Sequence, residues 1–337
     1  MLKIKQENQW PIAEHLKVRD EGNWTAVDAM RIRHEYQWVS AFEAPPIEGD
    51  TYADFIANRF VIDGDEMPDF AVWLDEIGGE FTRASTKNVR GPNGFLHGVP
   101  EHTPALDHDH TGARLGLLIE PASSIFHASA SPGSNDNVTG VDGSGADPFG
   151  GTAGRRAVES GGQGRKRLQG PNIGQATVGP ASTVTVTESI FVRPIDRNFF
   201  ALRNVANVVS WFWDIDGNRS RQGDHTVAPV IGHPPERYGN GFYRIAMTWT
   251  PNAGVLVSVA STNTWEPVWQ DGTPQTAGVA DTQIADYYGR QSERSATPTS
   301  FFVTGQRAAD MLDLPEGFRE VWDEDELHIV RIVTNHE

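Results

Sequence analysis

One short run combines the carboxylate and imidazole groups that bind divalent metal ions: Asp107-His108-Asp109-His110. Side chains alternate along an extended chain, so the two Asp would lie on one side and the two His on the other. Asp109 also begins a turn with Thr111 and Gly112, and an Asp at such a position accepts hydrogen bonds from the backbone N–H groups that follow. The sequence therefore predicts a capped turn here rather than a metal site.

A second oxygen-rich pattern has the i, i+2, i+4 spacing of a calcium loop and consists of Asp214, Asp216 and Asn218. The run lacks the later bidentate Glu of that motif and its loop length. Asp216-Gly217-Asn218 is also a hairpin turn signal, and we predict the turn. Asp214 and Asp216 remain the candidate metal ligands, and no cofactor is predicted.

No set of residues has the arrangement of an active site. Glycoside hydrolysis needs two carboxylates across a cleft, and the sequence offers only acids without an assigned role: Glu188, Asp214, Glu266 and Glu293. Gly143-Ser144-Gly145 lies in a Gly-rich stretch and not between a strand and a helix, where a nucleophilic Ser would be held. No phosphate-binding Gly-Lys loop is present. We predict that the chain is not an enzyme.

Exposed aromatic rings could stack on sugars. Trp265 and Trp269 flank Pro267 in a predicted loop, and these two are the candidate glycan contacts. Trp211 and Trp213 share one face of a predicted strand, so we expect them in the core.

The composition indicates a turn-rich β protein with aromatic packing: 34 Gly, 21 Pro, 10 Trp and 16 Phe among 337 residues. A net charge of -17 argues against nucleic-acid binding. The absence of Cys excludes disulfides and thiolate metal sites. No run approaches the roughly 18 apolar residues of a membrane helix, and MLKIKQENQW has no apolar signal region. Membrane insertion and signal-directed secretion are therefore not expected.

The amino-terminal region contains a repeat, because residues 16–27 and 30–41 align at an offset of fourteen positions. Each copy is typical of two short strands joined by a turn, with Trp24 or Trp38 on the second strand. An isolated hairpin of this size is marginally stable in water, so we expect it to dock on the rest of the chain or on another subunit. Trp24 and Trp38 are either attachment residues or the core of a small β subdomain, and the two interpretations are compatible.

The region from 44 to 121 is predicted to be an irregular linking segment, with one helix at 51–62 and one strand at 70–77. Within it, residues 79–121 alternate short extended pieces with turns and leave no room for a useful helix. Residues 128–180 are rich in Gly, Ser, Asn and Pro, which fits long loops in a β domain better than disorder.

Later segments alternate apolar and polar residues as strands do. Residues 182–193 are the clearest and are predicted to form a half-buried strand, and others follow at 199–202, 205–213, 242–250 and 254–260. Short strands at this spacing predict an all-β fold, an antiparallel sandwich or jelly roll. The strand at 327–333, next to the acidic residues 323–326, is expected to pair with an earlier sheet edge or a neighbouring subunit.

Several segments together carry a resemblance to a known class of proteins. Phe81-Thr82-Arg83-Ala84-Ser85 leads to Pro104, Leu106, Asp107, Asp109, Thr111 and Gly112, and then to Gly116-Leu117-Leu118-Ile119-Glu120. This pattern resembles tailed-phage virion proteins. The concanavalin-like, carbohydrate-binding jelly rolls that follow it in those proteins are similar at three further places: Asp147 to Gly150, Tyr238 to Arg244, and Thr297 to Phe301 running into Arg307-Ala308-Ala309-Asp310. The resemblance spans about residues 79 to 312, and His108 and His110 depart from it.

The resemblance implies four parts: an attachment repeat at 1–43, a linking or collar region at 44–121, a lectin-like jelly roll at 122–313, and a strand with an acidic tail at 314–337. It implies a non-enzymatic component of the virion, either a head fibre or decoration protein or a tail or baseplate appendage. The alternatives are a carbohydrate-binding module for host adsorption and a polysaccharide depolymerase.

The same resemblance implies the setting and the partners. The protein would be made in the host bacterial cytoplasm and act in the virion, bound to other virion proteins. A homo-oligomer is expected, with a trimer favoured, and host surface polysaccharide is a possible ligand. Jelly rolls of this type often hold a structural calcium ion, for which no position follows from the sequence.

Overall fold

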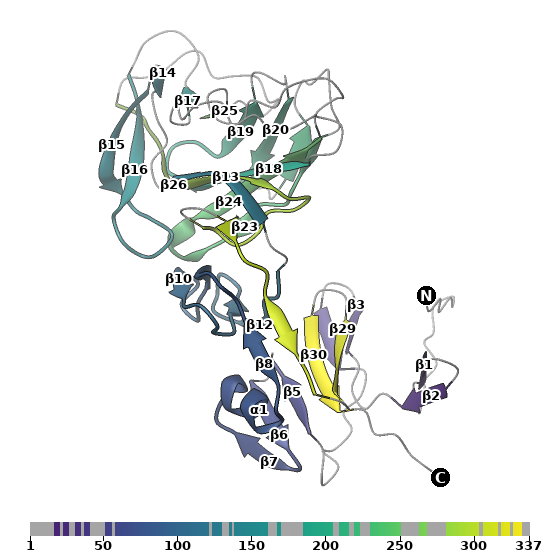
Figure 1. Cartoon of the computed structure of the whole chain (residues 1–337). Helices are drawn as coiled ribbons and strands as arrows, with labels where there is room; N and C mark the ends of the chain where they lie inside the picture. The colour runs from purple at the N-terminus through teal and green to yellow at the C-terminus, as the bar shows by residue number, and fades with distance from the viewer. Residues whose placement is uncertain are drawn as a thin grey trace. The chain divides into compact units, whose positions relative to one another are not determined.

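Figure 1 shows the computed structural model of the chain. It describes residues 17–20, 23–26, 31–34, 37–40, 51–55, 58–120, 123–129, 135–136, 138–160, 167–169, 185–204, 209–215, 219–222, 230–250, 263–267, 281–302, 306–315, 318–323 and 326–331. The chain divides into two compact units, Met1–Glu80 with Leu312–Glu337, and Phe81–Met311. Within the described ranges, no helix has the length and apolarity to cross a membrane.

The secondary structure is mostly antiparallel β-sheet, as predicted. The described residues contain one α-helix, and every strand pair for which a register is defined is antiparallel. The chain passes between the two units within β8 (Glu80–Thr82) and β28 (Met311–Asp313).

The first unit contains a five-stranded sheet and the helix. The sheet has the order β29-β30-β5-β6-β7, with the bounds β5 (Tyr52–Asp54), β6 (Arg59–Ile62), β7 (Asp65–Met67), β29 (Phe318–Asp323) and β30 (Glu326–Arg331). Strand β30 pairs with β5 through Ile329 opposite Ala53 and Val330 opposite Tyr52. This confirms that the carboxy-terminal strand pairs with an earlier sheet edge.

Two local predictions in this unit are wrong. The expected helix at 51–62 is replaced by β5 and β6, and the expected strand at 70–77 is replaced by helix α1 (Phe70–Glu76). The helix begins where the Asp69 carboxylate accepts a hydrogen bond from Val72 N at 2.9 Å. Phe70, Trp73 and Leu74 then have the i, i+3, i+4 spacing of a helix face, and all three are buried.

An aromatic core holds this unit together. Trp73 lies 5.8 Å from Phe70 and 5.9 Å from Phe318, measured between ring centroids, and its indole N–H donates to Val61 O at 2.8 Å. Phe55 packs edge-on against Phe70 at 4.7 Å. Tertiary packing therefore stabilises this helix, which is too short to be stable by itself.

The amino-terminal repeat forms two hairpins with the same register. Strands β1 (Lys17–Asp20) and β2 (Asn23–Ala26) pair, as do β3 (Arg31–His34) and β4 (Gln37–Ser40). Arg19 lies opposite Trp24, and fourteen residues later Arg33 lies opposite Trp38. Among the described strands, each of these four pairs only with its hairpin partner. The predicted repeat is confirmed, and each copy forms its own two-stranded sheet among the described residues.

Short hairpins and turns make up the start of the second unit, and residues 81–120 contain no helix, as predicted. The strands are β9 (Lys87–Arg90), β10 (Leu96–Val99), β11 (Leu106–His108) and β12 (Arg114–Leu117), paired as β9 with β10 and β11 with β12. Val89, Val99 and Ala105 form a small buried cluster beneath them.

Gly112 is required by a close approach between two turns. Its φ is +89°, and a Cβ atom there would lie 1.9 Å from the Pro92 carbonyl oxygen. We expect Gly112→Ala to lower the free energy of unfolding by at least about 2 kcal/mol, because both the backbone and the neighbouring turn must shift. A suitable control is Gly143→Ala, since Gly143 has φ +71° but its nearest neighbour, Thr152 O, is 3.9 Å away. The control should cost only about 1 kcal/mol in urea denaturation, and equal losses would contradict the prediction.

Two large sheets form the rest of this unit (Figure 1). The nine-stranded sheet has the path β15-β16-β26-β18-β24-β22, with β13, β23 and β27 attached to it. Its strands are β13 (Ser123–Ser129), β15 (Val138–Gly145), β16 (Gly154–Glu159), β18 (Val186–Pro194), β22 (Val230–Gly232), β23 (Glu236–Arg237), β24 (Tyr243–Trp249), β26 (Gln283–Arg294) and β27 (Gln306–Arg307). A 3-10 helix, η2 (Gly239–Gly241), precedes β24.

The second large sheet has six strands in the order β14-β17-β25-β19-β20-β21. These are β14 (Asn135–Asp136), β17 (Arg167–Gln169), β19 (Phe199–Asn204), β20 (Val209–Asp214), β21 (Arg219–Gln222) and β25 (Asn263–Pro267). The predicted turn at 216–218 and the predicted strand at 254–260 lie outside the described residues.

One hydrophobic core joins the two sheets. Ile190 and Ile245 of the larger sheet and Leu202 and Trp213 of the smaller one belong to the same buried cluster, and Trp211 packs against it. The core position predicted for Trp213 and Trp211 is thereby confirmed.

The central strands of the larger sheet, β18, β24 and β26, are buried on both faces. On β18, Ile190 belongs to the core shared with the smaller sheet, whereas Phe191 packs on the opposite face with Phe242 and Phe301. Thr187 and Ser189, which alternate with Val186, Glu188 and Ile190 along β18, are also buried. The predicted half-buried strand is therefore wrong in one respect, because its polar side faces protein rather than water. Such groups need hydrogen-bond partners.

Candidate functional site

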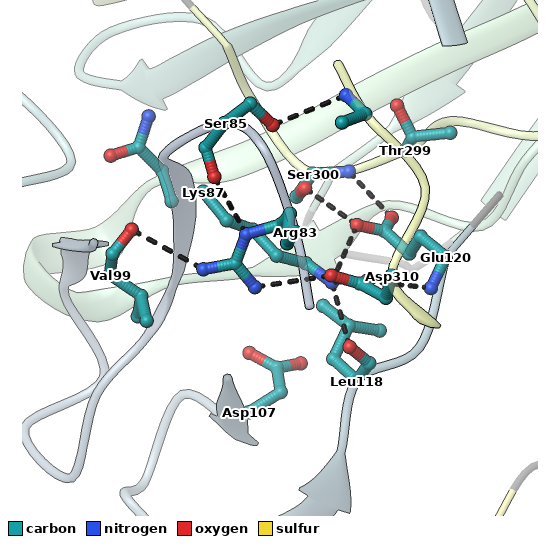
Figure 2. A network of polar contacts seen from close by, with 12 residues as sticks. Arg83, Ser85, Lys87, Val99, Asp107, Leu118, Glu120, Thr299, Ser300 and Asp310 are labelled. Carbon is teal, nitrogen blue, oxygen red and sulfur yellow. Dashed lines mark hydrogen bonds and ion pairs between the residues drawn. The ribbon is translucent and has the colours of Figure 1, made fainter. Parts of the chain in front are cut away.

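A buried ion network lies in the second unit, where residues 83–120 meet residues 300 and 310 (Figure 2). We define it by four charged residues: Arg83, Lys87, Glu120 and Asp310. Arg83 follows β8, Lys87 begins β9, Glu120 lies three residues after β12, and Asp310 directly precedes β28. Two cations thus meet two carboxylates, so the network is formally neutral.

Asp310 is the centre of the network. Its Oδ1 accepts from Arg83 Nη1 at 3.1 Å, and its Oδ2 accepts from Lys87 Nζ at 2.6 Å and from Glu120 N at 2.8 Å. The side chains of Asp310, Arg83 and Lys87 are all 0% exposed. One carboxylate therefore compensates two buried cations directly.

The two cations use their remaining donors on backbone carbonyls. Arg83 Nε donates to Ser85 O at 2.8 Å, and its Nη2 donates to Pro100 O at 2.6 Å. Lys87 Nζ donates to Leu118 O at 2.7 Å. These bonds tie the turns after β8 and β10 and the segment after β12 to the same point.

Glu120 extends the network toward the large sheet. Its carboxylate lies 3.0 Å from Lys87 Nζ and accepts from the backbone N–H of Ser300 at 2.8 Å and from the Ser300 hydroxyl at 2.6 Å. In return, Asp310 N donates to Glu120 O at 2.9 Å. Residues 300 and 310 are thereby held on the segment that follows β12.

The residues of the network come from segments that are far apart in the sequence. Arg83 belongs to the Phe81–Ser85 motif, Glu120 ends the Gly116–Glu120 motif, Ser300 lies in the Thr297–Phe301 motif, and Asp310 ends Arg307–Asp310. Arg83 and Asp310 are 227 positions apart. The separate motifs are thus parts of one structural feature.

No protein-family model matches the chain, and no curated protein matches it. Its function therefore has to be inferred from the residues and their geometry.

A buried polar layer connects the same motifs to the large sheet. Arg244, in the Tyr238–Arg244 motif, donates through Nη1 to Thr299 O at 2.5 Å and through Nε and Nη2 to Ser189 Oγ at 3.1 and 2.9 Å. Glu293 accepts from the backbone N–H of Thr299 at 2.9 Å and from its hydroxyl at 2.5 Å. The 297–301 segment is therefore held by side chains of β24 and β26, and Ser189 of β18 positions Arg244 for this contact.

Two of the four acids considered for catalysis, Glu188 and Glu293, make contacts inside the fold. Glu293 is fully buried and holds Thr299, and Glu188, also buried, pairs with Arg290 at 3.3 Å. Asp214 is the last residue of β20, and Glu266 lies in β25. A general acid or base must come within hydrogen-bond reach of its substrate. The geometry of Glu188 and Glu293 suits internal support of the fold.

Asp286 compensates two arginines at the other end of β26. Arg156 Nε donates to it at 2.8 Å, Ala146 N at 3.1 Å, and Arg193 forms a second ion pair with it. Burial alone would raise the pKa of Asp286, but the hydrogen bonds from Arg156 and Ala146 and the charge of Arg193 lower it below its usual value.

This lowered pKa predicts a pH dependence. Because the folded pKa lies below the unfolded one, the stabilisation by Asp286 is present above the unfolded Asp pKa of about 3.9 and is lost as the pH falls through the folded value. We expect Asp286→Asn to reduce the slope of the unfolding free energy against pH in this acidic range, measured by urea denaturation at a series of pH values. A variant with the wild-type slope would contradict the assignment.

Asp109 caps a turn directly after β11, as predicted. Asp109 Oδ1 accepts from Thr111 N and Thr111 Oγ1, each at 2.7 Å, and from Ala113 N at 3.0 Å. Burial by itself would raise the pKa of Asp109, and the hydrogen bonds from Thr111 and Ala113 lower it. Within the described ranges, no group of three or more potential metal ligands is found.

Asp107 and His108 of this run contact Arg90. Asp107 Oδ1 accepts from Arg90 N at 2.9 Å, and its Oδ2 accepts from Arg90 Nη2 at 2.7 Å. The buried His108 places Nδ1 3.0 Å from Arg90 O. The run therefore joins the two hairpins β9–β10 and β11–β12.

The remaining candidate residues are dispersed. Trp265 lies in strand β25 between β17 and β19, opposite Leu202 in the register, so the predicted loop is wrong at this position. Trp24 lies in β2 and Trp38 in β4. Asp216 and Trp269 lie outside the described residues. Glycan contact by Trp265 and Trp269, attachment by Trp24 and Trp38, and metal binding by Asp214 and Asp216 stay predictions.

Sequence reasoning missed the ion network, although it identified the motifs that contain most of its residues. The available signal was the placement of Arg83, Lys87 and Glu120 within short segments of strands and turns that also bury apolar residues. Charged residues in such places need partners. The sequence does not say which acid supplies the compensation, because the partner, Asp310, is more than 200 positions away.

Proposed function

We propose that this protein is a non-enzymatic structural component of a tailed-phage virion, either a head fibre or decoration protein or a tail or baseplate appendage. The observation that supports this most is the convergence of the four motif segments on the buried ion network. Arg83, Glu120, Ser300 and Asp310 bond to one another or to Lys87 between them. In this proposal, what the chain shares with phage virion proteins is a way of building the fold.

The finer fold that we propose is a lectin-like jelly roll. Two antiparallel sheets that share one hydrophobic core support it, since a sandwich is built in this way. The part of the predicted collar region that lies in the second unit, residues 81–120, would be a fixed support for the jelly roll because Arg83, Lys87 and Glu120 hold it to residues 300 and 310.

In this proposal the protein is made in the bacterial cytoplasm and assembles into the virion with other virion proteins. It forms a cyclic homo-oligomer, with a trimer favoured, because symmetric contacts multiply the strength of single weak ones. The amino-terminal hairpins are the attachment region.

Mass spectrometry of purified particles tests the location. We expect peptides of this chain to copurify with infectious particles through a density gradient, and labelling with a specific antibody to mark the head or the tail in electron micrographs. A chain that is abundant in the lysate but absent from the particles would overturn the proposal.

Two assays separate this function from its alternatives. A glycan array that includes host surface polysaccharides, probed with the full chain, should show no binding if the role is architectural. Specific binding that also competes with phage adsorption would favour a host-adsorption module. Release of reducing ends from host polysaccharide by the purified chain would instead indicate a depolymerase.

A further inference from the structure

Two arginines share one carboxylate on the larger sheet. Strands β16, β26 and β18 are neighbours, and their register sets both Arg156 and Arg193 opposite Asp286. Arg193 lies two residues after Phe191, so the row is on the face that points away from the core shared by the two sheets. We call these three residues the arginine row: Arg156, Asp286 and Arg193. Their formal charges sum to +1.

The carboxylate of the row has no acceptor capacity left. Asp286 Oδ1 accepts from Arg156 Nε at 2.8 Å, and its Oδ2 accepts from Arg156 Nη2 and from Ala146 N, each at 3.1 Å. Arg193 Nη2 also donates to Oδ2. A carboxylate has about four lone-pair sites, and these four bonds occupy them. One buried negative charge is therefore divided between two arginines.

Arg156 keeps one pair of donors unused. A guanidinium presents its N–H groups along two edges, Nε with Nη2 and Nη1 with Nη2, and each edge matches two oxygens of a carboxylate or phosphate. Arg156 bonds to Asp286 through the first edge. Within the described part of the chain, no hydrogen bond or ion pair uses its Nη1. The side chain is 31% exposed, so a ligand from solution can reach the second edge.

Arg193 contributes a second set of incompletely used donors. Its Nη1 donates to the exposed Asn240 Oδ1 at 3.4 Å, which is long for a hydrogen bond. Its Nε is buried and has no hydrogen-bond partner among the described residues. Buried donors of this kind are rare and are stabilised by any oxygen that accepts from them. The side chain as a whole is 25% exposed, so the guanidinium is accessible.

The buried ion network in the same unit shows how a purely structural set of charges is arranged. There, Arg83 and Lys87 meet two carboxylates, and Arg83 donates through all three of its nitrogens inside the protein. The arginine row differs in three respects: it has one carboxylate for two cations, it has unused donors, and solvent reaches it. The chain has a net charge of -17, so this positive excess is not part of a generally basic protein.

We infer that the arginine row is a binding site for an oxyanion, a carboxylate or phosphate group. Two oxygens of the ligand accept from the free edge of Arg156, and the charge of Arg193 adds attraction. A group with one negative charge makes the row neutral. This binding is a property of the isolated chain, so it holds or fails independently of a role in a virion.

Isothermal titration calorimetry of the full chain tests this inference with two probes, acetate and inorganic phosphate, at an ionic strength held constant with sodium chloride. Wild-type protein should bind at least one probe saturably at one site per chain, and the tighter probe identifies the preferred group. Arg156→Lys keeps the charge but lacks the fork, and it should weaken binding at least about tenfold.

The matched control is Arg59→Lys, the same substitution at an exposed ion pair in the first unit. It should change the affinity less than about twofold. Circular dichroism checks that both variants are folded. Absence of saturable binding of either probe to the wild-type chain, or equal affinities of the wild type and Arg156→Lys, would overturn the inference.

Chemical protection tests the same site without any substitution. Phenylglyoxal modifies accessible arginine side chains, and tandem mass spectrometry of the digested chain gives the rate at each position. A probe at about ten times its Kd should slow modification of Arg156 about tenfold, because the site is then mostly occupied, and should leave Arg59 unaffected. An unchanged rate at Arg156, or equal slowing at Arg59, would overturn the inference.

Discussion

Replacing Asp310 by Asn should destabilise the protein by about 3–5 kcal/mol, the cost of removing one partner from a buried ion pair. Asn has nearly the same shape as Asp, so the loss comes from charge and hydrogen bonding rather than from a cavity. Arg83 and Lys87 would remain in a site where their side chains are 0% exposed, without the carboxylate that accepts from both. Urea denaturation followed by Trp fluorescence measures the effect.

The control for Asp310→Asn is Glu66→Gln. Glu66 also forms an ion pair, with Arg59 at 3.0 Å, but the two side chains are 66% and 45% exposed. Exposed pairs of this kind contribute little, because water solvates each charge when the other is removed. The control should unfold at nearly the wild-type urea concentration. Equal behaviour of the two variants would show that burial of the network has no energetic importance.

Replacing Arg244 by Met should cost about 2–4 kcal/mol, although it adds no charge to the interior. The guanidinium supplies three hydrogen bonds, two to Ser189 Oγ and one to Thr299 O, and it lies 5.5 Å from the centre of the Phe191 ring. Met fills much of the same space but leaves the buried hydroxyl and carbonyl without these donors. The free energy of unfolding is again the quantity to measure.

Arg244→Lys separates charge from geometry at the same position. Lysine keeps the positive charge but lacks the planar fork that reaches Ser189 and Thr299 together. We expect a loss smaller than that of Arg244→Met but still clearly measurable. If lysine restored full stability, the charge of Arg244 rather than its bonding pattern would be what the fold needs.

Local patterns in the sequence predicted much of the β structure. The fourteen-residue repeat gave two hairpins with the same register, and the Asp109 turn formed as expected. Trp213 lies in the core, as its position on a strand face indicated. These features depend on residues close together in the chain, whose spacing and turn chemistry are visible directly.

Features that depend on tertiary contacts were harder to predict. Residues 70–76 are too few to give a strong helical pattern, and the helix depends on Trp73 packing against Phe318 from the other end of the chain. Likewise, Thr187 and Ser189 of β18 resemble a solvent-facing stripe. Their burial follows only when the 295–301 segment and Arg244 cover that face.

The ion network illustrates the same limit at the candidate site. The sequence identified the segments that contain Arg83, Glu120, Ser300 and Asp310 as related, but it could not show that they touch. Pairing a charge with a partner 227 positions away requires the complete fold. The network therefore emerges only from the structure, where it explains why these separate motifs occur in one chain.

A double-mutant cycle between Lys87 and Asp310 tests most directly whether the ion network joins these segments. The single changes are Lys87→Met and Asp310→Asn, at the two ends of the 2.6 Å ion pair. We predict that the double variant loses at least about 2 kcal/mol less stability than the sum of the two single losses, because removing both charges leaves neither of them unpaired with the other. Losses that add to within about 0.5 kcal/mol would contradict the account, since the two residues would then stabilise the fold independently.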